Sequence, residues 1–406
     1  MKRGFLSQYF EKIAIKKLSS VETDRGRSNQ HEFNGSASLK SFFGDNRLND
    51  LPVSFIWLGV ENEGLSEEGH VTWYDARERH PSRSEWRLYF KDNPVIDFAQ
   101  SGDLMILARR PNLQTYIVIV KEDTTFERQL FWLFGIDSEI GYEFQLKSVD
   151  QGHDPKVDFA VRYILEELGI EVQEPDSVLI DTIIEPYIDK GFPTTREFSK
   201  LTRDSMDECD PVKQPDHTLI QWMNWEEKLF KRLERHIIKE KLEKGFNDNS
   251  NLDVDGFLEF SLSVQNRRKS RVGYALENHL QEIFNENNIN HSRGKVTENK
   301  SRPDFLFPSI QFYHDLNFNE NKLTMLGVKS TCKDRWRQVL SEARRIDTKH
   351  LLTLEPGISE NQTHEMSANK LRLVLPRELH ETYTTKQREW LIGLGDFISL
   401  LKERQG

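Results

Sequence analysis

Three side chains in the carboxyl-terminal half of the sequence are of the types that together hydrolyse a phosphodiester. Asp304 precedes the apolar run Phe-Leu-Phe, Lys329 ends the run Met-Leu-Gly-Val-Lys, and Glu342 follows thirteen residues later (342 − 329). Mg²⁺ prefers carboxylate and water oxygens as ligands. A lysine beside the metal can orient a water and help to deprotonate it, while the metal offsets charge on the phosphate. The pattern predicts a metal-dependent DNA nuclease in which Asp304 and Glu342 bind Mg²⁺ and Lys329 acts on the water.

The second acid of this site is predicted to come from a helix. In the common arrangement of metal-dependent nucleases, an Asp or Glu stands two residues before the lysine and shares its strand face. This sequence has Gly327 there. Residues 334–346 carry apolar side chains at helical spacing, so we expect a helix that returns Glu342 to the vacant place, with Arg335 on the same helix face. Glu277, on the preceding amphipathic helix, is predicted to be a further catalytic acid, acting directly or through water.

Each of these residues also has an ordinary structural explanation. Asp304 alone would be a turn residue after a proline, Lys329 a lysine at a strand end, and Glu342 a solvated helix residue. The conjunction of the three favours the metal site.

Two aromatic features offer other chemistry. Tyr313 could be a covalent nucleophile on phosphate with His314 as its base. No arginine pair stands nearby, so a packed aromatic residue is the favoured interpretation. Trp222 and Trp225 could stack on a displaced base, although tryptophans at helical spacing more often belong to the core.

Length and cysteine usage limit the class of protein. A chain of 406 residues exceeds the usual size of one core, so two or three domains are expected. No apolar run approaches the roughly 18 residues that cross a bilayer, and polar residues interrupt the place where a signal peptide needs an apolar core. Neither Cys209 nor Cys332 has a CxxC or Cys/His neighbourhood, which argues against zinc or a disulfide framework. We expect a cytoplasmic protein without a membrane segment, in which Cys332 is buried.

The net charge of −10 does not argue against a DNA partner, because the charge of the binding face decides. Residues 329–349 hold seven basic and three acidic residues, a local surplus of four (7 − 3). Further basic clusters lie at 266–271 and 77–91. Solvated charged faces are the alternative interpretation. The predicted DNA contacts around the metal site are Lys333, Arg335, Arg337, Arg267, Arg268 and Arg271.

Short strands separated by polar turns are predicted for the amino-terminal part of the chain. They lie at 53–58, 70–74, 86–90, 103–108 and 115–120. This spacing is typical of a small barrel or sandwich. A helix is then predicted at 157–168. The proline-containing stretch 174–215 is predicted to contain the linker and the entry to a second domain, and we place the domain boundary near residue 180.

Helices alternate with strands in the remainder of the chain. Helices are expected at 225–243, 271–285 and 334–346, and strands at 323–328, 350–354 and 371–375. The alternation predicts an α/β domain, residues 181–406, with a mixed central sheet flanked by helices.

Three segments resemble the catalytic domain of the EcoRII restriction endonuclease family. They are Ser-Val-Gln-Asn-Arg-Arg-Lys-Ser-Arg at 263–271, Pro-Asp-Phe-Leu-Phe-Pro-Ser at 303–309 and Val-Lys-Ser-Thr-Cys-Lys-Asp-Arg-Trp-Arg-Gln at 328–338. The resemblance implies a PD-(D/E)xK nuclease fold in which the second acid has moved to the helix. It also implies that Lys333, Asp334 and Arg335 read the outer C:G pairs in the major groove. Arg and Lys donate to guanine O6 and N7 and Asp accepts from cytosine N4, so these side chains suit that task.

A fainter resemblance covers the amino-terminal end. Residues 9–20, 30–31 and 102–108 fall in the same order as in the family's amino-terminal effector domain, a pseudobarrel similar to plant transcription-factor DNA-binding domains. The resemblance implies that residues 1–180 bind a second copy of the recognition site and otherwise block the nuclease. The predicted DNA-contacting side chains of this mainly β domain are Arg25, Arg27, His31, Arg77, Arg79, Arg83 and Arg87.

These observations lead to one hypothesis and two rivals. We hypothesise a type II restriction endonuclease of the autoinhibited, effector-site class that cuts short CCNGG-like duplex sites with Mg²⁺. A homodimer is expected because a palindrome presents two equivalent strands. A modification-dependent nuclease, licensed by methylated DNA, would respond to substrate methylation. A DNA-binding regulator that lost the chemistry would bind its site without nicking it, but the intact set of acids and Lys329 speaks against it.

Overall fold

The computed structural model divides into two compact units. The first unit comprises Met1–Val172 with Gly357–Asn361, and the second unit comprises Gln173–Pro356 with Gln362–Gly406. The residues that the structure describes are 5–23, 31–59, 64–136, 139–149, 153–156, 158–172, 178–206, 208–248 and 251–406, without the side chains of Asp248, Asn251 and Asp334.

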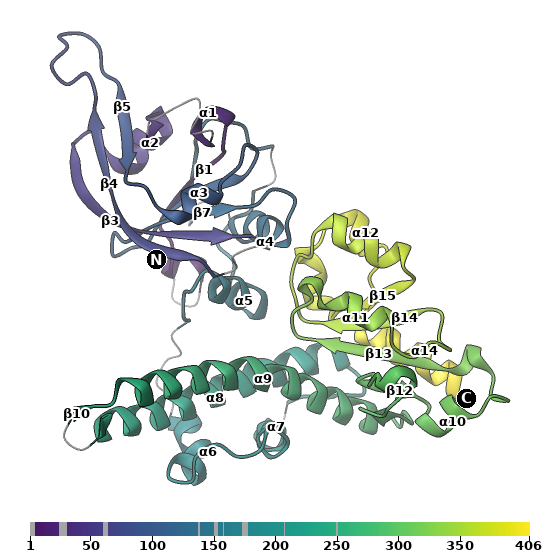
Figure 1. Cartoon of the computed structure of the whole chain (residues 1–406). Coiled ribbons are helices and arrows are strands. Elements are labelled where there is room, and N and C mark those ends of the chain that lie inside the picture. The colour runs from purple at the N-terminus through teal and green to yellow at the C-terminus, as the bar shows by residue number, and fades with distance from the viewer. Residues whose placement is uncertain are drawn as a thin grey trace. The chain divides into compact units, whose positions relative to one another are not determined.

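The first unit is built on an eight-stranded mixed sheet that curls strongly (Figure 1). The strand order is β2-β5-β4-β3-β7-β6-β1-β8, and the described pairings are antiparallel apart from β3 with β7. The strands are β1 (Lys12–Lys17), β2 (Glu32–Asn34), β3 (Leu48–Leu58), β4 (Ser66–Asp75), β5 (Trp86–Phe90), β6 (Leu104–Arg109), β7 (Thr115–Val120) and β8 (Gln145–Ser148).

Both faces of this sheet are covered, which explains the unbroken apolar runs in its central strands. Leu104 and Ile106 of β6 belong to one core, together with residues of α4 (Thr125–Phe134) and α5 (Phe159–Glu167). Met105 and Leu107 belong to the other core, with residues of α2 (Ala37–Phe43) and α3 (Pro94–Phe98). Successive side chains of a strand point to opposite faces, so a strand buried on both sides shows no alternation of apolar and polar residues.

The predicted strands of the first unit are confirmed in position. Those at 86–90 and 115–120 coincide with β5 and β7, whereas β3 and β4 are longer than predicted. The added residues lie in exposed or half-buried outer parts of the hairpin, where the apolar pattern that marks a strand fades.

The second unit contains a five-stranded mixed sheet in the order β11-β12-β13-β14-β15. The first three strands pair antiparallel, and β13, β14 and β15 pair parallel. The strands are β11 (Ser292–Arg293), β12 (Phe305–Phe307), β13 (Thr324–Lys329), β14 (Lys349–Thr353) and β15 (Leu371–Val374), and a separate small hairpin is formed by β9 (Asn247–Asp248) and β10 (Asn251–Leu252). The predicted strands at 323–328, 350–354 and 371–375 are thus confirmed to within one residue.

Two long helices lie side by side in this unit, α8 (Pro215–Lys244) and α9 (Val254–Glu286) (Figure 1). Both begin earlier than the predicted starts at 225 and 271. Pro215 occupies the first turn of α8, where its missing N–H costs nothing, and the Asp253 side chain caps α9 by accepting from Gly256 N at 2.9 Å. The described side chains of α9 before Arg271 are not buried. This half of the helix therefore has no apolar stripe from which the sequence could predict it.

The stretch 174–215 belongs to the second unit, which agrees with the predicted entry to a second domain, but its described part is helical and is not an unstructured linker. It contains α6 (Val178–Ile188) and α7 (Thr195–Asp204), which pack Ile184 and Phe198 against Phe230 and Leu233 of α8. Thr194 and Glu197 form a capping box at the start of α7. Among the described prolines of this stretch, Pro215 begins α8 and Pro186 lies inside α6, so proline does not mark an unstructured connection here.

The remaining short elements complete the two units. The helices are α1 (Ser20–Thr23), α10 (Ile310–His314), α11 (Trp336–Leu340), α12 (Glu360–Ala368), α13 (Thr385–Arg388) and α14 (Leu394–Gln405), and the 3₁₀ turns are η1 (Leu6–Gln8), η2 (Glu298–Lys300), η3 (Glu320–Lys322), η4 (Lys333–Arg335) and η5 (Arg377–Thr382). Within the described ranges, no helix has both the length and the apolar character needed to cross a membrane.

Candidate active site

Asp304 and Lys329 lie side by side at the ends of two neighbouring strands. Asp304 directly precedes β12, and Lys329 is the last residue of β13, which runs antiparallel to β12. The Oδ2 atom of Asp304 accepts hydrogen bonds from Val328 N at 2.6 Å and from Lys329 Nζ at 3.2 Å. Both side chains keep about a fifth of their surface exposed, 19% for Asp304 and 20% for Lys329. The structure thus brings together the acid and the lysine that the sequence paired, at a point that solvent reaches.

Gly327 has no room for the acid that the common nuclease arrangement places there. A Cβ atom at this position would lie 2.8 Å from Cγ2 of Val339 and 3.1 Å from its Cγ1. Val339 is fully buried on α11 and packs onto the strand at this point. The close approach of α11 to β13 therefore requires glycine, and a second carboxylate has to come from another element.

Glu342 is near Asp304, but the helix that was predicted to carry it ends earlier. α11 stops at Leu340, and Glu342 follows in a turn in which its N–H donates to Val339 O at 3.2 Å. The turn continues through Ala343, which has a positive φ of 46°. The predicted helix over 334–346 and the shared helix face of Arg335 and Glu342 are therefore wrong, because the chain turns away immediately after Leu340.

The Glu342 carboxylate is strongly perturbed. Its Oε2 atom is buried and has no hydrogen-bond partner among the described residues. Burial and the negative charge of Asp304 raise the pKa of Glu342 to about 7, against the opposing effect of Lys329 and Lys349. A buried carboxylate oxygen without a donor is costly, and a cation beside it would offset that cost.

Glu277 of α9 belongs to the same neighbourhood. Burial and the charge of Asp304 raise its pKa, while Arg293 and Lys329 act in the opposite direction. Its Oε2 atom accepts from Arg293 at 2.9 Å (Nη2) and 3.0 Å (Nε). The charge of Asp304, in the loop before β12, thus raises the pKa of both Glu277 on α9 and Glu342 in the turn after α11.

This set of donors fits a hard divalent cation. In the described ranges of the chain, no group of three His, Cys, Asp or Glu side chains forms a preassembled metal cage. Mg²⁺ usually keeps several waters and takes only one or two protein carboxylates together with substrate phosphate. Asp304 and Glu342 are carboxylates of the type that such a site uses, and the buried Oε2 of Glu342 has no hydrogen-bond partner among the described residues.

The predicted base-reading side chains follow β13 directly. Lys333 and Arg335 lie in η4, and Arg335 Nη2 donates to Thr331 O at 3.0 Å. The loop is anchored underneath, where Cys332 N donates to the buried Glu355 carboxylate at 2.5 Å. The side chain of Asp334 lies outside what is described. Cys332 itself is fully buried, as expected, and burial raises the pKa of its thiol.

The other arginines predicted to contact DNA in this unit differ in accessibility. Arg337 is half exposed and pairs with Glu365 at 2.9 Å. Arg267 lies over the ring of Phe192 at 4.3 Å, and Arg268 pairs with Glu234. Arg271, by contrast, is 4% exposed and its guanidinium is used inside the protein. A DNA contact needs a surface group, so Arg271 does not enter the function proposed below.

The predicted DNA-contacting residues of the first unit are partly described. Arg25 and Arg27 lie outside the described residues. Arg79 and Arg83 are exposed in the segment between β4 and β5. The remaining three form ion pairs at the surface: His31 with Asp92, Arg77 with Glu85, and Arg87 with Glu32 and Glu85.

The alternative chemistry of the aromatic residues finds no support. Tyr313 is 2% exposed and its hydroxyl donates to Glu298, and burial raises the pKa of this phenol. Trp222 is 5% exposed, and the indole of Trp225 donates to Ser205 Oγ at 2.9 Å. All three are packed residues of the fold, which confirms the ordinary interpretation.

Arg293 was missed by the sequence analysis although it touches the site. It stands alone between a histidine-serine pair and a glycine, in a strand of two residues, so neither charge clustering nor periodicity marked it. Only the folded structure reveals its contact with Glu277, in which Arg293 Nη2 lies 2.9 Å from Glu277 Oε2.

Comparisons with known proteins find similarity in the carboxyl-terminal part of the chain. Residues 230–398 match the family model described as EcoRII C terminal. The type II restriction enzyme EcoRII of Escherichia coli is 43% identical over 188 residues, which are 46% of this chain and 45% of that protein. The match therefore spans less than half the length of that relative.

Two solved structures show a weaker likeness. Metal-depleted Ecl18kI in complex with uncleaved, modified DNA has a TM-score of 0.45 and 18% identity, covering 55% of this chain and 83% of that one. The PspGI restriction endonuclease complex with substrate DNA has a TM-score of 0.44 and 14% identity, covering 54% of this chain and 96% of that one. The family model and the identity to EcoRII thus show that residues 230–398 are similar to the EcoRII C-terminal domain.

Proposed function

We propose that this protein is a Mg²⁺-dependent, site-specific endonuclease that cuts double-stranded DNA, a type II restriction enzyme. The observation that carries the proposal is the carboxylate pair of Asp304 and Glu342 beside Lys329. One of its oxygens is buried without a partner, and Lys329 Nζ lies 3.2 Å from the other acid. The kinship of residues 230–398 with EcoRII supports the same reaction class.

The site residues have separate tasks in this proposal. Asp304 and Glu342 would hold Mg²⁺, which when bound offsets the negative charge that develops on the scissile phosphate. Lys329, fixed by its hydrogen bond to Asp304 Oδ2, orients the attacking water and helps to deprotonate it. Glu277 lies in the same acidic neighbourhood, where it acts directly or through a water.

Sequence specificity would come from the loop after β13. Lys333, Asp334 and Arg335 are proposed to read the outer C:G pairs of a CCNGG-like palindrome, with Arg337, Arg267 and Arg268 as contacts to DNA at the edge of the site. Lys349 is buried, but Arg335 and Arg337 are exposed and favour a polyanion at this surface. A palindrome presents two equivalent strands, so a homodimer is the matching assembly.

The first unit is proposed to be the effector domain, a pseudobarrel that binds a second copy of the recognition site and otherwise blocks the nuclease. The curled eight-stranded sheet is compatible with that fold. His31, Arg77, Arg79, Arg83 and Arg87 are its proposed DNA contacts within the described residues. The domain boundary belongs before α6, near residue 173, because a cut at 180 would fall within that helix.

Plasmid digestion tests the nuclease proposal. The full chain should cut DNA that carries two CCNGG-like sites in Mg²⁺ and should be inactive in EDTA. Asp304→Ala should abolish cleavage, whereas Asp347→Ala, which removes an exposed carboxylate paired with Lys370, should cut like the unchanged protein. Undiminished cleavage by Asp304→Ala would overturn the assignment, and site-specific binding without nicking by the unchanged chain would favour a DNA-binding regulator.

A further inference from the structure

We propose that Arg293 is a positioning residue of the metal site, which fixes the Glu277 carboxylate beside Asp304. This inference rests on the proposed nuclease function and extends it to a residue outside the predicted catalytic set. The observation behind it is a guanidinium whose three nitrogens are all engaged by side chains of α9.

The backbone of Arg293 is tied to the segment that carries Asp304. Arg293 is the last residue of β11 and lies opposite Phe305, the residue after Asp304, in the antiparallel pairing of β11 with β12. The next residue, Gly294, donates its N–H to Asp304 O at 3.0 Å. The backbone positions of Asp304 and Arg293 are therefore coupled by hydrogen bonds between neighbouring strands.

The side chain of Arg293 connects this strand to helix α9. Its Nε and Nη2 atoms donate to Glu277 Oε2 at 3.0 and 2.9 Å. Its Nη1 atom donates to Asn278 Oδ1 at 2.7 Å and to Gln281 Oε1 at 2.9 Å. With 17% of the side chain exposed, the planar guanidinium has one available orientation, and it sets the direction of the Glu277 carboxylate.

Both bonds from Arg293 fall on the same oxygen of Glu277. Among the described residues, no hydrogen bond reaches the other oxygen, Oε1, although the charge of Asp304 acts on this carboxylate. Arg293 thus holds one oxygen of Glu277 and leaves the second available to a metal or to a metal-bound water. Ligand carboxylates are commonly held by such outer contacts, whose loss typically costs 10–100-fold in metal affinity.

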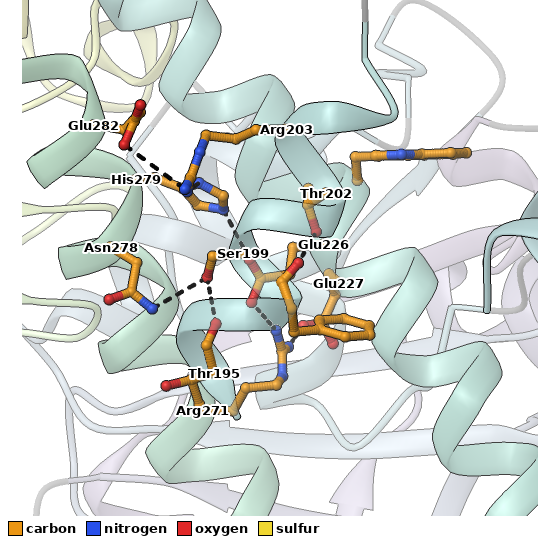
Figure 2. A network of polar contacts seen from close by, with 12 residues as sticks. Thr195, Ser199, Thr202, Arg203, Glu226, Glu227, Arg271, Asn278, His279 and Glu282 are labelled. Carbon is orange, nitrogen blue, oxygen red and sulfur yellow. Dashed lines mark hydrogen bonds and ion pairs between the residues drawn. The ribbon is translucent and has the colours of Figure 1, made fainter. Parts of the chain in front are cut away.

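Asn278 supports the arrangement from behind. Its Nδ2 atom donates to Ser199 Oγ at 3.2 Å, and Ser199 Oγ donates to Thr195 O at 2.9 Å, so the amide has its oxygen toward Arg293 and its nitrogen toward α7. Figure 2 shows Asn278 joined to Ser199, and Ser199 to Thr195, by these two hydrogen bonds. The candidate site is therefore connected by hydrogen bonds, through Arg293 and Asn278, to a helix in the stretch first predicted to be a linker.

The affinity for Mg²⁺ distinguishes two possible roles of Arg293, as a positioning residue and as a positive charge alone. If Arg293 acted only as a positive charge, Arg293→Met would tighten cation binding and Arg293→Lys would leave it unchanged. If Arg293 positions Glu277, both substitutions weaken binding, because lysine keeps the charge but loses the fork of three donors. Asn278→Ala, which keeps the charge and removes one of the two acceptors of Nη1, should weaken binding in the same direction and by less.

The experiment is calorimetric titration of the full chain with Mg²⁺ in the absence of DNA, together with cleavage rates over a range of Mg²⁺ concentrations. We expect Arg293→Met and Arg293→Lys to raise both the Kd for Mg²⁺ and the half-saturating Mg²⁺ concentration roughly tenfold. The matched control is Arg232→Met, which removes an arginine of similar exposure paired with Asp181 in the same unit. It should change neither quantity.

The outcomes are distinguishable. An unchanged Kd in Arg293→Lys, or a tighter one in Arg293→Met, overturns the positioning role. If Arg293→Met does not fold, Arg293→Lys and Asn278→Ala decide by the same criterion. If the unchanged chain binds Mg²⁺ but does not cut DNA, the nuclease proposal fails while the calorimetric comparison still decides the role of Arg293.

Discussion

Single atoms decide the form of the candidate site. Asp304 and Lys329 were recognisable from the sequence because Asp304 precedes one apolar run and Lys329 ends another. In the structure, Lys329 Nζ lies 3.2 Å from Asp304 Oδ2. The sequence placed Glu342 on a helix, and this part of the prediction is wrong. The helix ends at Leu340, and Glu342 lies in a turn that continues through Ala343, where φ is positive. Nothing in the residue types of 341–346 distinguishes such a turn from two more turns of helix.

Gly327 is predicted to be intolerant of any side chain. Gly327→Ala should destabilise the second unit by about 1–3 kcal/mol, because its Cβ would overlap Val339 Cγ2 at 2.8 Å. Thermal or urea unfolding measures the effect. In the double variant with Val339→Ala the overlap is gone, so the cost of adding Gly327→Ala should largely vanish. A full cost in the Val339→Ala background would contradict the assigned contact.

His350 is predicted to make stability fall on acidification. Burial lowers its pKa to about 3 in the folded chain, against an ordinary value of about 6.5 when unfolded. The unfolded state then binds the extra proton below pH 6.5, so stability is full above that pH and declines as pH falls toward 3. Between pH 7 and pH 5 the loss should be about 2 kcal/mol.

The test compares unfolding at the two pH values in His350→Phe and in His364→Phe, an exposed histidine of α12. The ring of His350 lies 5.0 Å from that of Phe397, so an aromatic replacement suits the space. The pH dependence should shrink in His350→Phe and persist in His364→Phe. Equal pH dependence in both variants would refute the buried, neutral histidine.

At the scale of elements, strands were easier to predict than helix lengths. The buried strands β13, β14 and β15 carry apolar runs of the right length, and each was placed to within one residue. The long helices α8 and α9 were cut short, because the exposed first half of α9 has no apolar stripe. The helices α6 and α7 were overlooked because prolines near their ends suggested a linker.

A buried polar cluster connects α8 and α9 (Figure 2). The sequence analysis did not predict this cluster. Glu226 is fully buried, with Oε2 at 2.9 Å from His279 Nε2 and Oε1 at 3.4 Å from Arg271 Nη1. Arg271 also pairs with Glu227 and lies over the ring of Phe230 at 4.0 Å. The positive charge of Arg271 is used in this buried contact. The basic cluster at 266–271 therefore contributes less to the surface charge than the sequence suggests.

Removing the central charge of this cluster should be costly. Glu226→Gln leaves a buried arginine with one acidic partner fewer, and we expect a loss of about 3 kcal/mol in unfolding free energy. Glu240→Gln on the same helix, which removes an exposed pair with Lys244, is the matched control and should change stability by less than about 0.5 kcal/mol. Equal stability of the two variants would show that the cluster contributes nothing to the α8–α9 contact.

At the scale of the whole molecule, two compact units differ in how much the sequence revealed. The α/β alternation and the site motifs predicted the second unit, whereas the first unit showed only short strands and a fainter resemblance. The topology of its sheet, with β3 parallel to β7 inside an otherwise antiparallel order, depends on pairings between distant segments that single-strand patterns do not encode.

Autoinhibition is a prediction at this scale. A chain that begins at residue 173 keeps α6 whole and lacks the proposed effector domain. On DNA with a single recognition site it should cut faster than the full chain, because the block and the need for a second site are both removed. Circular dichroism establishes that the shortened chain is folded. An unchanged or lower rate from a folded shortened chain would contradict autoinhibition.

The central claim is that Glu342 supplies the second acid of one metal site shared with Asp304. Glu342→Gln keeps the shape of the side chain and removes only its charge, and Glu320→Gln, an exposed carboxylate paired with Arg345, is the matched control. The direct measurement is the single-turnover rate of cleavage of a bound duplex at saturating Mg²⁺. Glu342→Gln should cut at roughly one hundredth of the rate of the unchanged chain or below, and Glu320→Gln should cut at the unchanged rate. A Glu342→Gln variant that cuts at the rate of the unchanged chain would contradict the account.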